Sequence, residues 1–287
     1  MYQTPLPPPT VPPGALAPLP PLIGVIHLRA LPGAPHAESD IAAIAASCAR
    51  DAQALAEAGF DGMIIENYGD APFEPKKVSA ITVAAMTRCA LAARVTAPML
   101  PLGINVLRND AEAALAIAAA VGASFIRVNV HIGARLTDQG IIEGMAHETL
   151  RLRRNLGATH VRLLCDVDVK HAAPIAPRPL ADEAQDLAYR GGADALLVTG
   201  RGTGKTVALR DMHEVISAVS TPVYVASGVT ESNLQSVASA YGVIVGSCLR
   251  ADGKAGGRID PPTAKRFADA YRAVRERRAP EIVVDDG

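Results

Sequence analysis

Residues able to transfer protons stand at the ends of short apolar runs in this sequence. Glu66 ends the run GMIIE, and Asp166 ends the run VRLLCD, which leads into the titratable cluster DVDVKH. A lysine or histidine beside carboxylates supplies acid and base groups of different pKa, as general acid–base catalysis requires. A solvated loop is the alternative for this cluster, and Schiff-base formation at Lys170 is another. The predicted catalytic residues are Glu66, Asp166, Lys170 and His171.

Amide, guanidinium and imidazole side chains near the same run ends suit ligand orientation. In the run SFIRVNV, alternate residues share a face, so Phe125, Arg127 and Asn129 should point into the same space. A buried arginine is costly unless it meets a carboxylate or an anionic ligand. A purely structural ion pair with Asp166 is therefore the alternative. The predicted substrate-binding residues are His27, Asn67, Asn105, Arg127, Asn129, Asp138, Thr199 and Gly200.

Two small-residue turns close to the C-terminus indicate a phosphate site. SGVT follows the run PVYVA, and a Gly-Ser pair ends the run GVIVGS. Such turns let backbone N–H groups converge on phosphate at a helix N-terminus, and their hydroxyls add donors. The alternative is that the glycines only permit tight turns. The predicted phosphate-binding residues are Ser227, Gly228, Gly246 and Ser247.

The stretch TGRGTGKT at residues 199–206 is close to a P-loop but has Thr199 where the first glycine should stand. We expect instead a loop whose amides and Lys205 fold over an anionic ligand. A divalent metal held by the carboxylates and histidines named above is a further alternative. No H-x-x-x-H spacing supports it, so the prediction assigns no metal ligand and no certain cofactor.

The elements that must position these residues repeat eight times along the chain. The predicted strands are LIGVIHL, GMIIEN, PMLPLGIN, SFIRVNV, VRLLCDV, DALLVTG, PVYVASG and GVIVGS. The predicted helices cover residues 39–58, 78–94, 110–121, 141–156, 180–190, 207–219, 231–240 and 262–278. Strand-then-helix repeated eight times predicts a (β/α)8 TIM barrel of the phosphate-binding type, whose strand ends meet at one mouth. Residues 137–144 are predicted to form a polar lid with glycine hinges.

Composition limits the class of protein. The chain has 287 residues, a net charge of -1 and 3% aromatic residues, which argues against a nucleic-acid partner. Four scattered cysteines without a CxxC pair, and no membrane-length apolar stretch, predict a cytoplasmic protein. Ala-rich helices favour a homo-oligomer. The predicted domains are a Pro-rich lead-in at residues 1–21, disordered or swapped onto a neighbour, one barrel at 22–278, and a loose tail at 279–287.

Several long runs resemble the BtpA/SgcQ family. They are GVIHLRALPGAP, ENYGDAPF, GINVLRNDAEAALAIA, FIRVNVHIGARLTDQGIIEG, DVDVKHA, LLVTGRGTGK, ASGVT and VGSCLRADG, and they span residues 22–267. The resemblance implies a TIM barrel in a cytoplasmic or membrane-peripheral protein. One family namesake is linked to photosystem I biogenesis, another belongs to a bacterial sugar-utilisation setting, and the family has been labelled a nucleoside triphosphatase. The resemblance transfers no residue roles.

These observations favour an enzyme that acts on a phosphorylated small molecule, such as a sugar phosphate or a ribosyl phosphate. Acid–base groups at a barrel mouth suit isomerisation, aldol-type cleavage or glycosyl-bond hydrolysis. A non-catalytic assembly or stability factor for a larger complex is the first alternative. A nucleotide or nucleoside hydrolase that uses the loop around Lys205 is the second.

Overall fold

The computed structural model describes residues 18–37, 40–200 and 208–277. In this part of the chain, eight parallel strands close into a barrel in the order β1-β11-β10-β9-β7-β4-β3-β2. The strands are β1 (Leu22–His27), β2 (Gly62–Glu66), β3 (Leu102–Asn105), β4 (Phe125–Val128), β7 (Arg162–Asp166), β9 (Ala195–Val198), β10 (Val223–Val225) and β11 (Gly242–Val245). The predicted (β/α)8 barrel is confirmed.

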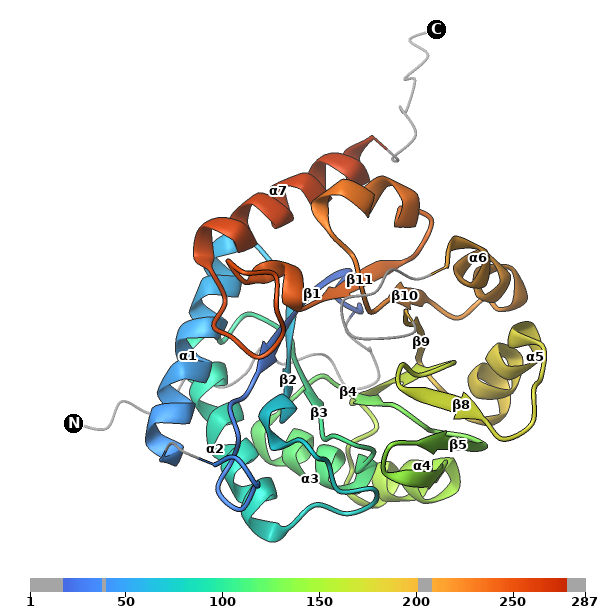
Figure 1. Cartoon of the computed structure of the whole chain (residues 1–287), viewed down its shortest axis with the longest axis horizontal. Helices are drawn as coiled ribbons and strands as arrows, with labels where there is room; N and C mark the ends of the chain where they lie inside the picture. The colour runs from blue at the N-terminus through green and yellow to red at the C-terminus, as the bar shows by residue number, and fades with distance from the viewer. Residues whose placement is uncertain (1–17, 38–39, 201–207, 278–287) are drawn as a thin grey trace, which may run out of the picture.

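Helices surround the barrel, as Figure 1 shows. They are α1 (Ile41–Ala58), α2 (Ala80–Thr96), α3 (Ala111–Val121), α4 (Ala146–Asn155), α5 (Leu180–Gln185) with a π-helical turn at Asp186–Arg190, α6 (Leu209–Ala218) and α7 (Pro261–Glu276). Short 3-10 helices lie at Tyr68–Asp70, Glu231–Val237 and Ser247–Leu249. Gly59 and Gly122 end α1 and α3 in the left-handed conformation, at φ 85° and 66°, where a side chain would be strained.

Strand parity divides the buried residues into two layers. Ile126 and Val128 of β4 pack against the helices, whereas Phe125 belongs to the apolar cluster inside the barrel. Gly103 on the neighbouring strand makes room for that ring, because a Cβ there would lie 2.0 Å from a Phe125 ring carbon. The apolar layer fills the barrel below its mouth, and the polar residues of the barrel interior gather at the C-terminal strand ends.

The end of the predicted lead-in is packed rather than loose. Leu19 is buried within the inner apolar cluster, and the Leu19 and Pro20 carbonyls accept hydrogen bonds from the Tyr241 and Tyr224 hydroxyls, at 2.7 and 3.0 Å. These residues close the N-terminal end of the barrel. Residues 1–17 of the predicted lead-in, the tail at 279–287 and residues 201–207 of the Lys205 loop lie outside the described residues.

The helix predicted over residues 141–156 is wrong in its first part. Ala134–Thr137 (β5) and Gly140–Glu143 (β6) form an antiparallel hairpin, and Ala172–Pro174 (β8) pairs with the other edge of β5. The two residues between β5 and β6 make the turn, and Gly140 follows at φ 95°. Because β5 and β6 pair across this turn, Ile141 and Ile142 belong to strand β6. Helix α4 therefore begins only at Ala146. The predicted lid is therefore part of a small sheet.

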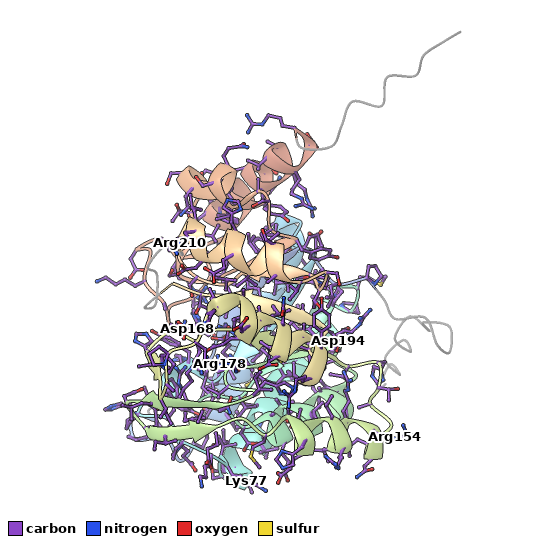
Figure 2. All side chains as sticks on the ribbon, turned by 90° about the vertical axis from the view of Figure 1, so that its right-hand side faces the viewer. Lys77, Arg154, Asp168, Arg178, Asp194 and Arg210 are labelled. Atoms are coloured by element: carbon purple, nitrogen blue, oxygen red, sulfur yellow. The ribbon has the colours of Figure 1, made fainter. Side chains whose placement is uncertain are left out.

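This small sheet lies at the mouth end of the barrel. Asp168, which follows β7, and Arg178, which follows β8, lie toward one end of the side view in Figure 2, whereas Asp194 lies toward the other. Asp194 precedes β9, where Arg153 pairs with its carboxylate at 2.8 Å. No helix among the described residues is long and apolar enough to cross a membrane.

Candidate functional site

A buried ion network occupies the top of the barrel interior. Arg127 of β4 forms a two-pronged pair with Asp166 of β7, at 3.0 Å from Nη2 to Oδ1 and 3.2 Å from Nε to Oδ2. Its Nη1 reaches Oε1 of Glu66 on β2 at 3.2 Å. All three side chains are at most 5% exposed. The ion pair between Arg127 and Asp166 that the sequence suggested as an alternative is therefore present. Glu66 is a second carboxylate in the same network.

Two asparagines extend this network. Asn105 Nδ2 donates to Glu66 Oε1 at 2.9 Å, and Asn129 Nδ2 donates to Asp166 Oδ2 at 2.6 Å. Both Asp166 oxygens are thus engaged by neighbours, whereas Glu66 Oε2 accepts no hydrogen bond from a described residue. The buried Asn129 Oδ1 also has no hydrogen-bond partner in the described part. These two oxygens are the acceptors that the network leaves available.

Charge and burial fix the protonation of Glu66 and His27. Burial is the largest single influence and alone would raise the pKa of Glu66, but Arg127, His27, Lys170 and the Asn105 hydrogen bond together hold that pKa below its ordinary value. Burial, followed by the positive charge of Arg250, lowers the pKa of His27 to about 3. His27 Nδ1 accepts the Gly256 N–H at 3.2 Å, which assigns the proton of the neutral ring to Nε2. That Nε2 lies 3.9 Å from Glu66 Oε2.

Lys170 brings a half-buried amine to the same place. It follows β7 and lines a cavity together with His27, Glu66 and Arg127. Its amine forms no hydrogen bond or ion pair with a described residue. Burial first, and then the charge of Arg127, lowers the pKa of Lys170. The amine therefore gives up its proton more readily than an exposed lysine does, which suits a base or a nucleophile.

The predicted phosphate loops also line this cavity. Ser227, Gly228, Gly246 and Ser247 all line it. Gly228 adopts φ 66°, where a side chain would be strained, and a Cβ on Gly246 would crowd the His27 ring at 3.0 Å. The Ser227 hydroxyl donates to the Ala226 carbonyl at 2.6 Å. A 3-10 helix begins at Ser247, directly after Gly246.

Other predicted site residues lie away from the cavity walls. Asn67 is buried and fully engaged, since its amide bonds the Asp70 carboxylate and both backbone groups of Leu107. Asp138 is exposed in the hairpin turn, and His171 is exposed at φ 58°. Thr199 Oγ1 donates to the Asp168 carbonyl at 2.9 Å, and Gly200 is buried beside it.

Two buried arginines that support the site were not predicted from the sequence. Arg250 donates to the carbonyls of Gly246, Val25 and Gly257 at 2.6, 3.0 and 3.0 Å, so it ties the second of the predicted phosphate loops to β1. Arg108 donates to the Lys170 carbonyl at 2.6 Å. The available signal was an arginine that follows a leucine shortly after a strand, in VLRND after β3 and in SCLRADG after β11.

Comparison with known proteins decides the family. The sequence pattern of the BtpA family matches residues 19–273. This chain belongs to the BtpA family. It is 43% identical over 270 residues to the photosystem I biogenesis protein BtpA of a Synechocystis strain, a match that covers 92% of this chain and 93% of the relative.

Solved structures of other proteins share the fold of this BtpA-family chain. A thiamine phosphate pyrophosphorylase from Pyrococcus furiosus superposes with a TM-score of 0.55 at 13% identity, covering 89% of this chain and 96% of that one. A phosphoribosyl anthranilate isomerase from Thermus thermophilus gives 0.53 at 13% identity, covering 88% and 100%. At these identities the likeness shows the TIM-barrel fold.

The cavity of this family member combines an ionised carboxylate, a neutral imidazole and an amine of lowered pKa. Such a set can remove a proton from one atom and return it to another. Among the described residues, no group of three His, Cys, Asp or Glu side chains could hold a metal ion. The side chains that line the cavity can support acid–base or amine chemistry.

Proposed function

We propose that this BtpA-family protein is an enzyme that acts on a phosphorylated small molecule, of the sugar phosphate or ribosyl phosphate class. One observation carries the proposal. The loops that contain Ser227 and Ser247 share a single cavity with Glu66 and Lys170. A phosphate held by those loops would place the rest of its molecule against groups that transfer protons.

The geometry suggests separate roles for the two carboxylates. Glu66 Oε2, which Arg127 and Asn105 leave available, is the proposed proton acceptor. Asp166, taken from the sequence as a catalytic residue, is proposed to position Arg127, because both of its oxygens are engaged. The unpartnered Asn129 Oδ1 lies beside Asp166 on the wall of a neighbouring cavity, so Asn129 would position Asp166 and not contact the ligand.

Lys170 completes the proposed acid–base set with the neutral His27 ring. Proton removal beside a carbonyl, followed by its return at another atom, is an isomerisation. If a carbon–carbon bond breaks instead, the same groups support an aldol-type cleavage, and Lys170 could then form a Schiff base. The names of the two similarly folded enzymes, which both include a phosphorylated compound, support the phosphate part of this proposal.

A non-catalytic assembly factor is the second candidate function. It is favoured by the name of the Synechocystis relative and by the outward face of the small sheet. Leu136 and Ile141 pair across β5 and β6 and are 56% and 57% exposed, and Ile175 beyond β8 is 60% exposed. Exposed apolar residues of this kind can contact a partner protein.

We also propose a cytoplasmic location and a homo-oligomer. The four cysteines, which are all free and lie within the described residues, support that location. Three exposed apolar side chains of α2 support the oligomer, because Ile81, Leu91 and Val95 are 49%, 46% and 68% exposed.

A thermal-shift screen against sugar phosphates, nucleotides, nucleosides and inorganic phosphate tests the enzyme proposal. A phosphorylated ligand at about 100 times its Kd should stabilise the protein by about 2.7 kcal/mol, which is several degrees in Tm. We expect this shift to be lost when Ser227→Ala and Ser247→Ala are combined, since both serines line the cavity.

Ser236→Ala is the matched control, because Ser236 is exposed on the 3-10 helix Glu231–Val237. It should keep the full shift. An unchanged shift in the double variant would place the phosphate elsewhere. A screen in which no phosphorylated compound stabilises the protein would favour the assembly-factor candidate.

A further inference from the structure

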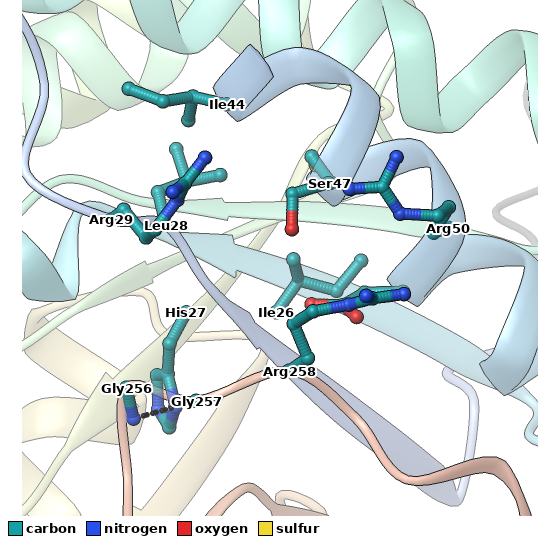
Figure 3. Close-up of a pocket in the computed structure, with 12 residues that line it drawn as sticks. Ile26, His27, Leu28, Arg29, Ile44, Ser47, Arg50, Gly256, Gly257 and Arg258 are labelled. Carbon is teal, nitrogen blue, oxygen red and sulfur yellow. Dashed lines mark hydrogen bonds between the residues drawn. The ribbon is translucent and has the colours of Figure 1, made fainter. Parts of the chain in front are cut away.

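A second cavity lies on the outer side of β1, away from the barrel interior. It has a volume of about 360 Å³ and is bounded by the end of β1, the first half of α1 and the segment 256–258 before α7 (Figure 3). Its apolar floor includes Ile26, Leu28 and Ile44. None of the catalytic or phosphate-loop residues proposed above, apart from His27, lines it.

Three arginines from different parts of the chain surround this outer cavity. Arg29 follows β1, Arg50 lies on α1 and Arg258 precedes α7, and all three are exposed. None forms a hydrogen bond or ion pair with a residue in the described ranges. Three guanidinium groups without acceptors around one concavity form a strongly positive site.

One carboxylate only partly balances these charges. Asp51 lines the cavity, is 4% exposed and accepts the Ile259 N–H at 3.2 Å. Even with Asp51 fully ionised, three arginines leave two positive charges in excess. A phosphate monoester carries about -1.5 to -2 at neutral pH, so its charge matches this excess.

We propose that the outer cavity is a second binding site, for a phosphate-bearing anion. The planar guanidinium groups of Arg29, Arg50 and Arg258 would bind the phosphate oxygens in pairs. In Figure 3 the Ser47 hydroxyl points into the space among these arginines, where it adds a neutral donor. The apolar floor would contact the carbon skeleton that carries the phosphate.

This outer site is joined to the barrel mouth by His27. The His27 ring lines both cavities, and its Nδ1 accepts the N–H of Gly256, two residues before Arg258. An anion that holds Arg258 therefore acts on the segment that orients the His27 ring. The outer site is an effector site, and it does not depend on the enzyme proposal being correct.

Calorimetric titration with pyrophosphate and with inorganic phosphate tests the outer site. We expect combined Arg50→Gln and Arg258→Gln to weaken one binding event at least about tenfold, as expected for loss of charge-assisted hydrogen bonds. Arg151→Gln with Arg277→Gln makes the same change in net charge on α4 and at the end of α7, so it should leave binding unchanged.

The Ser227→Ala, Ser247→Ala variant separates the two proposals. If the barrel mouth also binds phosphate, this variant loses phosphate binding at the mouth. It keeps the binding at the outer cavity that depends on Arg50 and Arg258. If the mouth does not bind phosphate, the event at the outer site stands alone. Equal affinity in wild type and in the Arg50/Arg258 variant, or no binding of either anion by wild type, would overturn the proposal.

Coupling between the outer site and the barrel mouth can be measured separately in the Ser227→Ala, Ser247→Ala variant. The imidazole ¹⁵N signals of His27 should shift when pyrophosphate is added, because the Gly256 hydrogen bond to Nδ1 responds. The shift should be absent once Arg50→Gln and Arg258→Gln are added. Signals that stay fixed while pyrophosphate binds would show that the outer site is not coupled to the mouth.

Discussion

Replacing Arg127 with Met should destabilise the protein by about 3–5 kcal/mol, the usual result of removing one partner of a buried ion pair. Glu66 and Asp166 would both keep their burial and lose their shared cation. At roughly 2–4 °C per kcal/mol, Tm should fall by about 6–20 °C. Thermal and urea unfolding of the wild type and the variant would measure the change.

The size of this loss should depend on pH. In the wild type, Arg127 holds the pKa of Glu66 below its ordinary value, so the stability that Glu66 contributes is present above its unfolded pKa and disappears as the pH falls through its lowered folded pKa. Without Arg127, burial dominates and raises that pKa. Protonation of Glu66 then stabilises the folded variant. The difference in unfolding free energy between the wild type and the variant should therefore narrow from pH 8 toward pH 5.

A charge-matched variant separates this explanation from a simple loss of packing. Adding Glu66→Gln and Asp166→Asn to Arg127→Met removes the uncompensated charges at nearly constant volume, and should restore much of the lost stability. Arg153→Met, at a half-buried pair with Asp194, is the control and should cost about 1 kcal/mol. A loss that is independent of pH and not relieved in the triple variant would contradict the electrostatic account.

Much of the barrel could be predicted because its signals are local. Apolar runs of strand length, helices ended by glycines such as Gly122, and alternation within SFIRVNV all arise from short-range geometry. The small sheet of β5, β6 and β8 was not predicted from the sequence, because its strand pairing is partly non-local. Leu136 pairs with Ile141 across a turn, but also with Ala173, which the sequence alone does not connect. Tertiary pairing therefore replaced the first turn predicted for α4.

The site was predicted in part for a related reason. Parallel strands bring their C-terminal residues to one mouth, so Glu66, Asn105 and Arg127 could be expected to meet. Which side chains of a loop turn inward is not encoded in strand order. Lys170 lines the cavity, whereas the adjacent His171 is exposed.

The supporting arginines and the outer cavity depend on contacts between distant segments. Arg250 bonds the carbonyl of Val25, 225 residues away. Arg29, Arg50 and Arg258 come from three separate elements, and each alone resembles an ordinary surface arginine. No residue spacing in the sequence predicts such a cluster, so it can be recognised only from the fold.

Lys170→Met should abolish turnover of the phosphorylated substrate found by the screen while leaving the fold and phosphate binding in place. We expect kcat to fall about 100-fold or more, as for loss of a general acid or base, with little change in KM. The side chain makes no hydrogen bond or ion pair with a described residue, and its neighbours Glu66 and Arg127 keep their own pair. Steady-state kinetics and the ligand-induced Tm shift would measure the two effects separately.

Lys170→Arg distinguishes proton transfer from simple charge. An arginine keeps the positive charge but does not deprotonate, so it should be as inactive as Met if the amine must act as a base or nucleophile. Wild-type turnover should then rise with pH through the lowered pKa of Lys170, since only the neutral amine reacts. Lys254→Met, at an exposed position, is the control. Full activity in Lys170→Arg would mean that this residue only supplies charge, and the proton acceptor would then be Glu66 alone.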